Sequence, residues 1–158
     1  MAYNIIFYFS DQQRWDTCGC FGQPLNITPN LDELAAEGVK FDNAFSPQPV
    51  CGPCRALFQT GKYPTETGCF RNNLMLPSQI KTLGEYMEKD AGYETAYIGK
   101  WHLDAPYRPY VDTYNNKGEV AWNEWCPPER RHGFDKWIAY GTYDNHLKPM
   151  YWDTKSGR

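Results

Sequence analysis

Cys51 and Arg55 stand close together in the segment Cys51-Gly52-Pro53-Cys54-Arg55, where a thiol beside a guanidinium could do chemistry. Pro53 favours the first turn of a helix, and residues 56–60 can continue it, which would place Cys51 at the helix N-terminus. A thiol in that position ionises readily, and the same position attracts anions. The segment therefore predicts an activated nucleophile or a redox dithiol of Cys51 and Cys54, with a buried structural turn as the plain alternative.

Lys100 and His102 form a second group that could act on an anion. They belong to the segment Gly99-Lys100-Trp101-His102, which follows a predicted buried strand over residues 93–98. Alternate side chains of an extended chain project to the same side, so both could contact the oxygens of one oxyanion. A single histidine would more often be an ordinary hydrogen-bonded residue, but the pair favours an anion-binding site.

Asp11 and Gln12 are candidate metal ligands because they directly follow the apolar run of residues 4–10. Polar residues at the carboxyl end of a buried strand indicate a site. Carboxylate and carbonyl oxygens are hard ligands that suit calcium or magnesium. Gln12 offers only a neutral carbonyl, so such a site would bind calcium more weakly or take ligands from elsewhere. Taken alone, Asp11 would be a helix or loop cap.

The elements that must position these groups alternate along the chain. Apolar runs predict strands over residues 4–10, 39–45, 93–98 and 136–140. Caps, prolines and apolar spacing predict a helix between Thr28 and Gly38, a short one continuing over residues 56–60, and one over residues 78–90. Since each polar cluster follows a strand, we expect an α/β fold with its site along the carboxyl ends of the strands.

The charge balance argues against nucleic acid and membrane partners. The 16 Lys and Arg against 19 Asp and Glu give a formal net charge of -3, so the chain lacks an overall basic field. The run of residues 4–10 is too short to span a bilayer, and it carries no export signal. The compartment stays open between cytoplasm as the sequence stands and periplasm or secretion for the native protein.

The cysteines predict mostly reduced thiols. A chain of 158 residues can bury one real core, so it needs no disulfides for stability. Zinc binding is disfavoured, because the chain has only 3 histidines and no complete zinc spacing. The six residues concerned are Cys18, Cys20, Cys51, Cys54, Cys69 and Cys126.

Over a longer window, residues 49–61 resemble the modification motif of the type I, formylglycine-dependent sulfatases. That motif is cysteine, any residue, proline, a small residue and arginine, ending in Thr-Gly. Cys51, Pro53 and Arg55 supply its core, while Cys54 stands where serine or alanine is usual and Gln59 where an apolar residue is usual. An unmodified Cys51 could also pair with Cys54 and block modification.

A second stretch strengthens the resemblance. Residues 92–102 are similar to the second sulfatase motif, a Gly-aromatic start followed by Gly-Lys, an aromatic residue and His. Residues 28–32 and 132–135 extend the likeness over residues 4–140. The resemblance implies an alkaline-phosphatase-like α/β fold, a mixed sheet flanked by helices, of which residues 1–158 would be the N-terminal part of a longer catalytic domain. This part alone is expected to have an incomplete metal site and little or no activity.

The resemblance also implies a mechanism. A formylglycine-generating enzyme would convert Cys51 to formylglycine, whose hydrated form attacks the sulfur of a small-molecule or carbohydrate sulfate ester. Asp11, Gln12 and the modified Cys51 would bind Ca²⁺, with Mg²⁺ or Mn²⁺ as alternatives. Arg55 would stabilise the nucleophile. Lys100 and His102 would bind the sulfate and neutralise developing charge, or His102 would assist proton transfer.

Two other functions fit parts of the same pattern. A phosphate or phosphonate monoester hydrolase of the same superfamily would use the same metal, cations and nucleophile. The segment from Cys51 to Cys54 also matches the redox motif of thioredoxins, although only about six helix-compatible residues follow it. Aromatic residues such as Tyr110, Trp122 and Trp125 could stack on a sugar, or could close a small core instead.

Overall fold

The computed structural model describes residues 3–104, 107–108, 119–120, 126–141, 147 and 151–154. The chain divides into two compact units, Met1–Phe45 and Ser46–Arg158. Tyr110, Trp122 and Trp125, the candidate sugar-stacking residues, lie outside the described residues. No helix in the described ranges is long and apolar enough to cross a membrane.

The N-terminal unit contains two short 3-10 turns, η1 (Trp15–Thr17) and η2 (Gly19–Phe21), and one helix, α1 (Pro29–Glu37). As predicted, Thr28 precedes the helix and Gly38 follows it. The carboxylate of Asp32 joins α1 to η2, because its Oδ1 accepts hydrogen bonds from the Cys20 amide at 2.7 Å and the Thr28 hydroxyl at 3.2 Å.

The predicted strands over residues 4–10 and 39–45 are wrong for the structure as described. Both segments are extended or bent chain without strand pairing. Their apolar side chains are largely exposed, with Ile6 90% and Val39 79% accessible. An apolar run becomes a strand only through hydrogen bonds to a neighbouring strand, and neither segment has one among the described residues.

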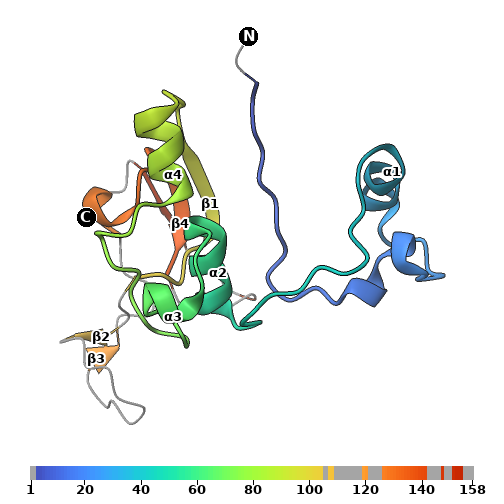
Figure 1. Cartoon of the computed structure of the whole chain (residues 1–158), viewed down its shortest axis with the longest axis horizontal. Helices are drawn as coiled ribbons and strands as arrows, with labels where there is room; N and C mark the ends of the chain where they lie inside the picture. The colour runs from blue at the N-terminus through green and yellow to red at the C-terminus, as the bar shows by residue number, and fades with distance from the viewer. Residues whose placement is uncertain are drawn as a thin grey trace. The chain divides into compact units, whose positions relative to one another are not determined.

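The C-terminal unit is built around a mixed sheet, which confirms the predicted mixed α/β class (Figure 1). Strand β1 (Ala96–Lys100) runs parallel to β4 (Lys136–Tyr140), and β4 pairs antiparallel with β5 (Trp152–Asp153). A separate antiparallel pair joins β2 (Tyr107–Arg108) and β3 (Glu119–Val120).

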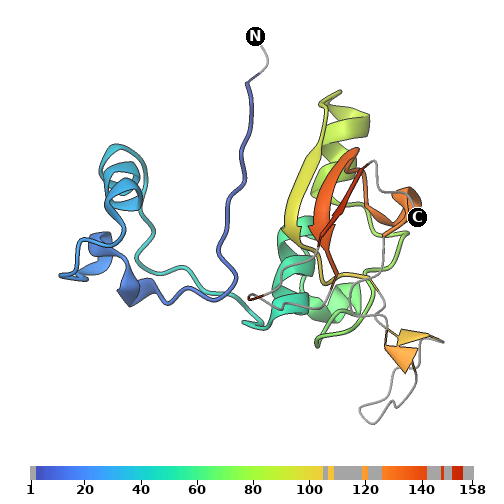
Figure 2. The same cartoon turned by 180° about the vertical axis from the view of Figure 1, so that it is seen from behind.

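Helices surround this sheet. They are α2 (Cys51–Thr60), α3 (Pro64–Thr67), α4 (Leu83–Glu85) continued by the π-helical η3 (Tyr86–Asp90), and the 3-10 turn η4 (Pro128–Arg130). Figures 1 and 2 show α2 and α3 near the end of the sheet where β1 finishes. This arrangement brings the first turn of α2 toward the residues that follow β1.

Three predicted boundaries move in the C-terminal unit. Strand β4 has the predicted bounds and α2 begins at Cys51 as expected, but β1 starts at Ala96 and extends to Lys100. The helix predicted from residue 78 begins at Leu83, because Thr82 and Glu85 form a capping box in which each side chain accepts from the other's backbone N–H.

The core of this unit is an aromatic cluster between the sheet and its neighbouring loops. Tyr97 stacks on Trp137 with ring centroids 5.3 Å apart, and Trp101 meets both rings edge-on at 5.0 and 5.1 Å. Trp101 and Trp137 are each only 1% exposed. Such edge-to-face and stacked pairs add about 1 kcal/mol each to the free energy of burial.

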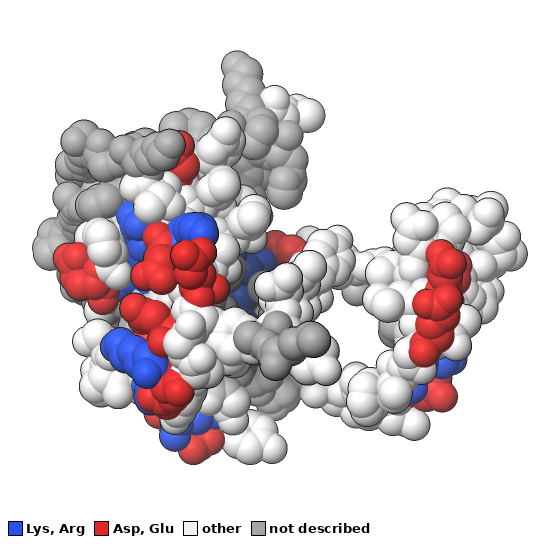
Figure 3. Space-filling view, turned by 90° about the horizontal axis from the view of Figure 1, so that it is seen from above, with Lys and Arg blue, Asp and Glu red and all other residues white. Residues whose placement is uncertain are grey.

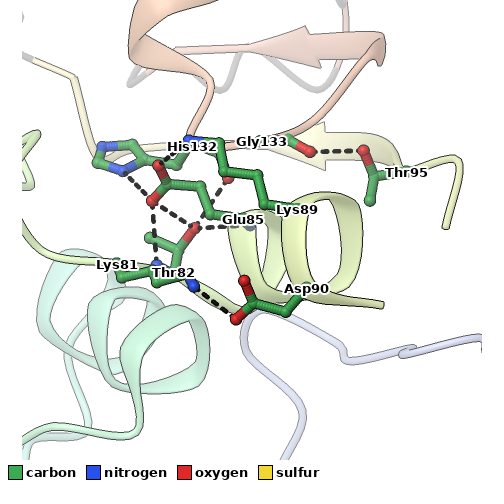
Figure 4. A network of polar contacts seen from close by, with 8 residues as sticks. All are labelled: Lys81, Thr82, Glu85, Lys89, Asp90, Thr95, His132 and Gly133. Carbon is green, nitrogen blue, oxygen red and sulfur yellow. Dashed lines mark hydrogen bonds and ion pairs between the residues drawn. The ribbon is translucent and has the colours of Figure 1, made fainter. Parts of the chain in front are cut away.

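A polar network joins α4 to the loop before β4 (Figure 4). The Thr82 hydroxyl donates to the His132 carbonyl at 2.8 Å, and the Thr95 hydroxyl donates to the Gly133 carbonyl. Nδ1 of His132 lies 3.9 Å from Oε2 of Glu85. The network fixes the loop that leads into β4 and thus the pairing of β4 with β1.

Charged side chains of both signs lie next to one another on the face shown in Figure 3. One ion pair of the C-terminal unit with both side chains exposed is that of Lys136 with Glu94 at 2.6 Å. Exposed pairs of this kind contribute little to stability. No disulfide joins the six cysteines, all of which lie in the described ranges, and their reduced state stays a prediction.

Gly133 should be intolerant of a side chain. Its φ is +82°, and a Cβ there would lie 2.5 Å from the backbone nitrogen of Glu85. Gly68 is a matched control, because its φ is +79° but nothing lies within 4 Å of its Cβ position. We expect Gly68→Ala to lower the free energy of unfolding by about 1 kcal/mol and Gly133→Ala by about 2 kcal/mol more. Denaturant unfolding measures both variants. Equal losses of unfolding free energy in Gly68→Ala and Gly133→Ala would contradict the close contact at Gly133.

Acidification should destabilise the network around His132. Burial lowers the pKa of His132 below 6.5. Burial alone would raise the pKa of Glu85, but hydrogen bonds from Lys89 and the Thr82 backbone lower it below 4.5. In both cases the unfolded state binds more protons, so stability is lost as pH falls below 6.5 for His132 and below 4.5 for Glu85.

Unfolding free energies measured from pH 8 to pH 3 test this pH dependence. We expect His132→Gln to flatten the decline that begins near the ordinary histidine pKa of 6.5. Glu85→Gln should flatten only the decline below 4.5, the ordinary glutamate value. A His132→Gln curve with the same slope as the wild type above pH 5 would exclude the buried-histidine explanation.

Candidate active site

Cys51 is the first residue of α2 and is half-buried. Val50 precedes the helix in an extended conformation and gives no side-chain cap. Pro53 fits the first turn because the backbone N–H groups there have no partner within the helix. The amide of Gly52 instead donates to Oδ1 of Asn72 at 2.8 Å. The predicted helix N-terminal position of Cys51 is therefore confirmed.

Lys100 lies next to Cys51. It is the last residue of β1, it is only 7% exposed, and its Nζ is 3.8 Å from the Cys51 sulfur. An ammonium group this close, shielded from water, attracts negative charge placed at position 51. Two of the predicted site residues thus meet, although 49 residues separate them in the sequence.

Arg55 lies one turn further along α2 and is 6% exposed. One terminal nitrogen, Nη1, donates to the Lys100 carbonyl and lies 3.3 Å from the Tyr97 hydroxyl. The Tyr97 hydroxyl donates to the same carbonyl. These hydrogen bonds tie α2 to the end of β1, so Arg55 holds the backbone from which the Lys100 side chain projects.

The backbone conformation at His102 differs from the predicted extended one. Lys100 ends the strand, and His102 has a left-handed backbone with φ of 55°, so the two are not alternate residues of one extended segment. Nε2 of His102 lies 3.1 Å from Oδ1 of Asn73. Because Asn72 bonds Gly52, adjacent asparagines contact the start of α2 and His102.

Asp11 and Gln12 belong to the N-terminal unit, where both side chains are exposed. Their oxygens are of the hard type that calcium and magnesium prefer, so their chemistry fits part of a metal site. Among the described residues, no three His, Cys, Asp or Glu side chains gather in a way that could hold a metal ion. The roles of Asp11, Gln12 and Cys51 as metal ligands stay a prediction.

Three residues of this region were not singled out from the sequence: Tyr97, Asn72 and Asn73. Tyr97 was counted only as part of an apolar strand, and its hydroxyl gave no separate signal. Asn73 has a φ of 65°, a conformation that asparagine tolerates better than most residues. A pair of asparagines in a loop is a weak signal, since such residues are common in turns.

The dithiol alternative gains no support from α2. The helix ends at Thr60, and Gly61 follows in a left-handed conformation, so no long helix follows the two cysteines. Cys51 and Cys54 are both free, and the Cys54 sulfur lies 3.6 Å from the Ser46 hydroxyl oxygen. The short helix therefore does not support a redox dithiol, whereas the buried ammonium of Lys100 beside Cys51 can attract an anion.

Comparison with known proteins agrees with the motifs. The family model described as Sulfatase matches residues 3–155. The chain is 43% identical to an ulvan-active sulfatase of Formosa agariphila over 150 residues, which cover 95% of the chain and 26% of that protein. The chain therefore spans about a quarter of this relative's length.

Solved structures show the same relationship. The crystal structure of yidJ from Bacteroides fragilis matches with a TM-score of 0.80 and 54% identity, over 94% of this chain and 33% of that one. The structure of another protein, in complex with its substrate D-glucosamine-2-N,6-O-disulfate, matches with a TM-score of 0.56 and 32% identity. The match covers 78% of this chain and 20% of that one. The predicted alkaline-phosphatase-like fold is confirmed by these neighbours, and the chain belongs to the sulfatase family.

Proposed function

We propose that this chain supplies the nucleophile and part of the anion-binding site of a sulfuric ester hydrolase. The observation that carries the proposal is the distance of 3.8 Å between Nζ of Lys100 and Sγ of Cys51. Arg55, at the centre of the same motif, holds the Lys100 backbone. A cation next to the first residue of a helix suits the attack of a nucleophile on a sulfate group. The nucleophile and the sulfate group both carry or develop negative charge, which the cation stabilises.

Formylglycine fits position 51. The side chain there is half-buried at a helix N-terminus, and Lys100 offers a hydrogen-bond donor to an oxygen that replaces the sulfur. Formylglycine would supply a hydrated aldehyde, whose hydroxyl groups serve first in attack on sulfur and then in release of sulfate. Cys51, Pro53 and Arg55 would be read by a formylglycine-generating enzyme, which is the partner protein that we propose.

Each cationic side chain has a separate task in this proposal. Lys100 binds a sulfate oxygen and neutralises the charge that develops during attack. Arg55 keeps Lys100 in place and stabilises the nucleophile from within the helix. His102 binds the sulfate group or accepts a proton. Asp11 and Gln12 would contribute hard oxygen ligands to Ca²⁺, or to Mg²⁺ or Mn²⁺, and that ion would supply further positive charge to the reaction.

A carbohydrate sulfate is the substrate class that we propose. Relatives include an ulvan-active sulfatase and a protein whose structure holds a glucosamine disulfate. The alternative substrate is a phosphate or phosphonate monoester, because the same cations would stabilise a phosphoryl group. The two differ in the charge of the transferred group, so a direct comparison of rates separates them.

Conversion of Cys51 can be measured by mass spectrometry. After coexpression with a formylglycine-generating enzyme, the peptide containing Cys51 should show the mass change of a thiol replaced by an aldehyde. Cys54→Ser should be converted at least as well, because it removes the thiol that could pair with an unconverted Cys51. Pro53→Ala should lose most of the conversion. Unconverted Cys51 in the wild-type chain would count against the proposed nucleophile.

The role of Lys100 can be measured with the modified protein. We expect Lys100→Ala to lower kcat/KM for 4-nitrophenyl sulfate about 100-fold, because a preorganised charge next to the nucleophile is lost. Lys62→Ala is the matched control, since Lys62 is exposed in the same unit and should leave the rate unchanged. Faster turnover of 4-nitrophenyl phosphate than of the sulfate would favour the phosphate ester alternative.

A further inference from the structure

His102 is held by an asparagine that comes from the loop between α3 and α4. Its Nε2 lies 3.1 Å from Oδ1 of Asn73, and His102 is only 4% exposed. Both residues have left-handed backbones, with φ of 65° at Asn73 and 55° at His102. This conformation is unfavourable for most residues other than glycine, so two such residues in one contact indicate a geometry that the surroundings maintain.

The segment that carries Asn73 is anchored on both sides. Oδ1 of Asn72 accepts from the Gly52 amide at 2.8 Å, next to Cys51. The Leu76 amide donates to the Leu103 carbonyl at 3.0 Å, directly after His102. Because one anchor is the first turn of α2 and the other adjoins His102, the segment sets where the imidazole lies relative to position 51.

We propose that Asn73 is a positioning residue that fixes the tautomer of His102. An amide oxygen can only accept a hydrogen bond, so the nitrogen facing it, Nε2, must carry the proton. The lone pair of the neutral imidazole is then on Nδ1. Nδ1, which is buried, is then the ring atom that can take up a proton without turning, and the resulting imidazolium keeps its bond to Asn73.

This role deepens the proposed function and rests on it, because a histidine that accepts a proton has a task only if hydrolysis takes place. It also selects between the two tasks open to His102. With Nε2 bonded to Asn73, the neutral ring leaves Nδ1 as its proton acceptor, so this arrangement suits proton transfer better than charge neutralisation. Lys100 is then the permanent cation of the pair.

Nuclear magnetic resonance can test the tautomer directly. The chain has 3 histidines, so a long-range proton–nitrogen correlation spectrum of the chain labelled with nitrogen-15 histidine should contain three ring patterns. His102→Gln identifies the pattern of His102 by its loss. At a pH where the ring is neutral, we expect Nε2 to be protonated and Nδ1 bare. A protonated Nδ1, or an even mixture of tautomers, would overturn the proposal.

Variants separate a positioning role from a structural one. Asn73→Gly removes the side chain while keeping the left-handed backbone accessible, and it should shift His102 toward a mixture of tautomers. Asn73→Asp should restore the Nε2-protonated form, because a carboxylate also accepts from Nε2–H. Asn72→Ala removes the anchor to Gly52 but keeps the Asn73 amide, so it should keep the Nε2-protonated form if the Asn73 side chain itself fixes the tautomer. An unchanged tautomer in Asn73→Gly would also overturn the proposal.

The spectrum needs neither modified Cys51 nor substrate, so its outcome is independent of the proposed hydrolysis. If the tautomer is as stated and the modified protein does not cleave sulfate esters, the proposed function fails while the role of Asn73 in fixing the tautomer stands. In an active protein, Asn73→Gly should lower kcat about 10-fold or more with little change in KM, and Asn73→Asp should recover part of that loss.

Discussion

The guanidinium of Arg55 is the interaction on which the candidate site depends. It is buried, and Nη1 donates to the carbonyl of Lys100 at the end of β1. A carbonyl at the end of a strand needs a partner when it is buried, and a charged donor satisfies it strongly. Removing Arg55 would leave the Tyr97 hydroxyl as a side-chain donor to this carbonyl and would break the charged contact between α2 and β1. The approach of Lys100 to Cys51 follows from this bond, because it fixes α2 against the strand.

The aromatic core determines where that bond can form. The hydroxyl of Tyr97 donates to the same Lys100 carbonyl, and its ring stacks on Trp137 of the neighbouring strand. Trp101, between Lys100 and His102, packs edge-on against both rings and continues the pairing through its amide, which donates to the Tyr140 carbonyl at 2.8 Å. Trp101 thus anchors its two neighbours, Lys100 and His102. The positions of both site residues therefore depend on packing in the aromatic core.

The sequence predicted the elements whose boundaries are set locally. Strand β4 could be placed because apolar residues alternate within it, and Cys51 could be placed because Pro53 marks a first helical turn. The start of α4 was missed because Ser78 and Thr82 both look like caps. Only the carboxylate of Glu85, three residues after Thr82, distinguishes them. Residues 4–10 have the composition of a buried strand, but composition cannot supply the neighbouring strand that such a segment needs.

The sequence singled out Cys51 and Lys100, which the structure brings together, but it did not predict the backbone geometry at His102. The motif placed Lys100 and His102 two residues apart, and extended geometry would have pointed them the same way. The structure turns the chain at His102 into a left-handed conformation, which β-strand patterns do not encode. Non-glycine residues with positive φ are uncommon, and in the described residues the other two are Asn73, which contacts His102, and His132, which lies in the loop before β4. Strain of this kind persists only where surrounding bonds over-determine the backbone. Here the bonds are those of Leu76 with Leu103 beside His102 and of Thr82 with His132, so the two histidines are held in strained turns by hydrogen bonds from the segment that joins α3 to α4.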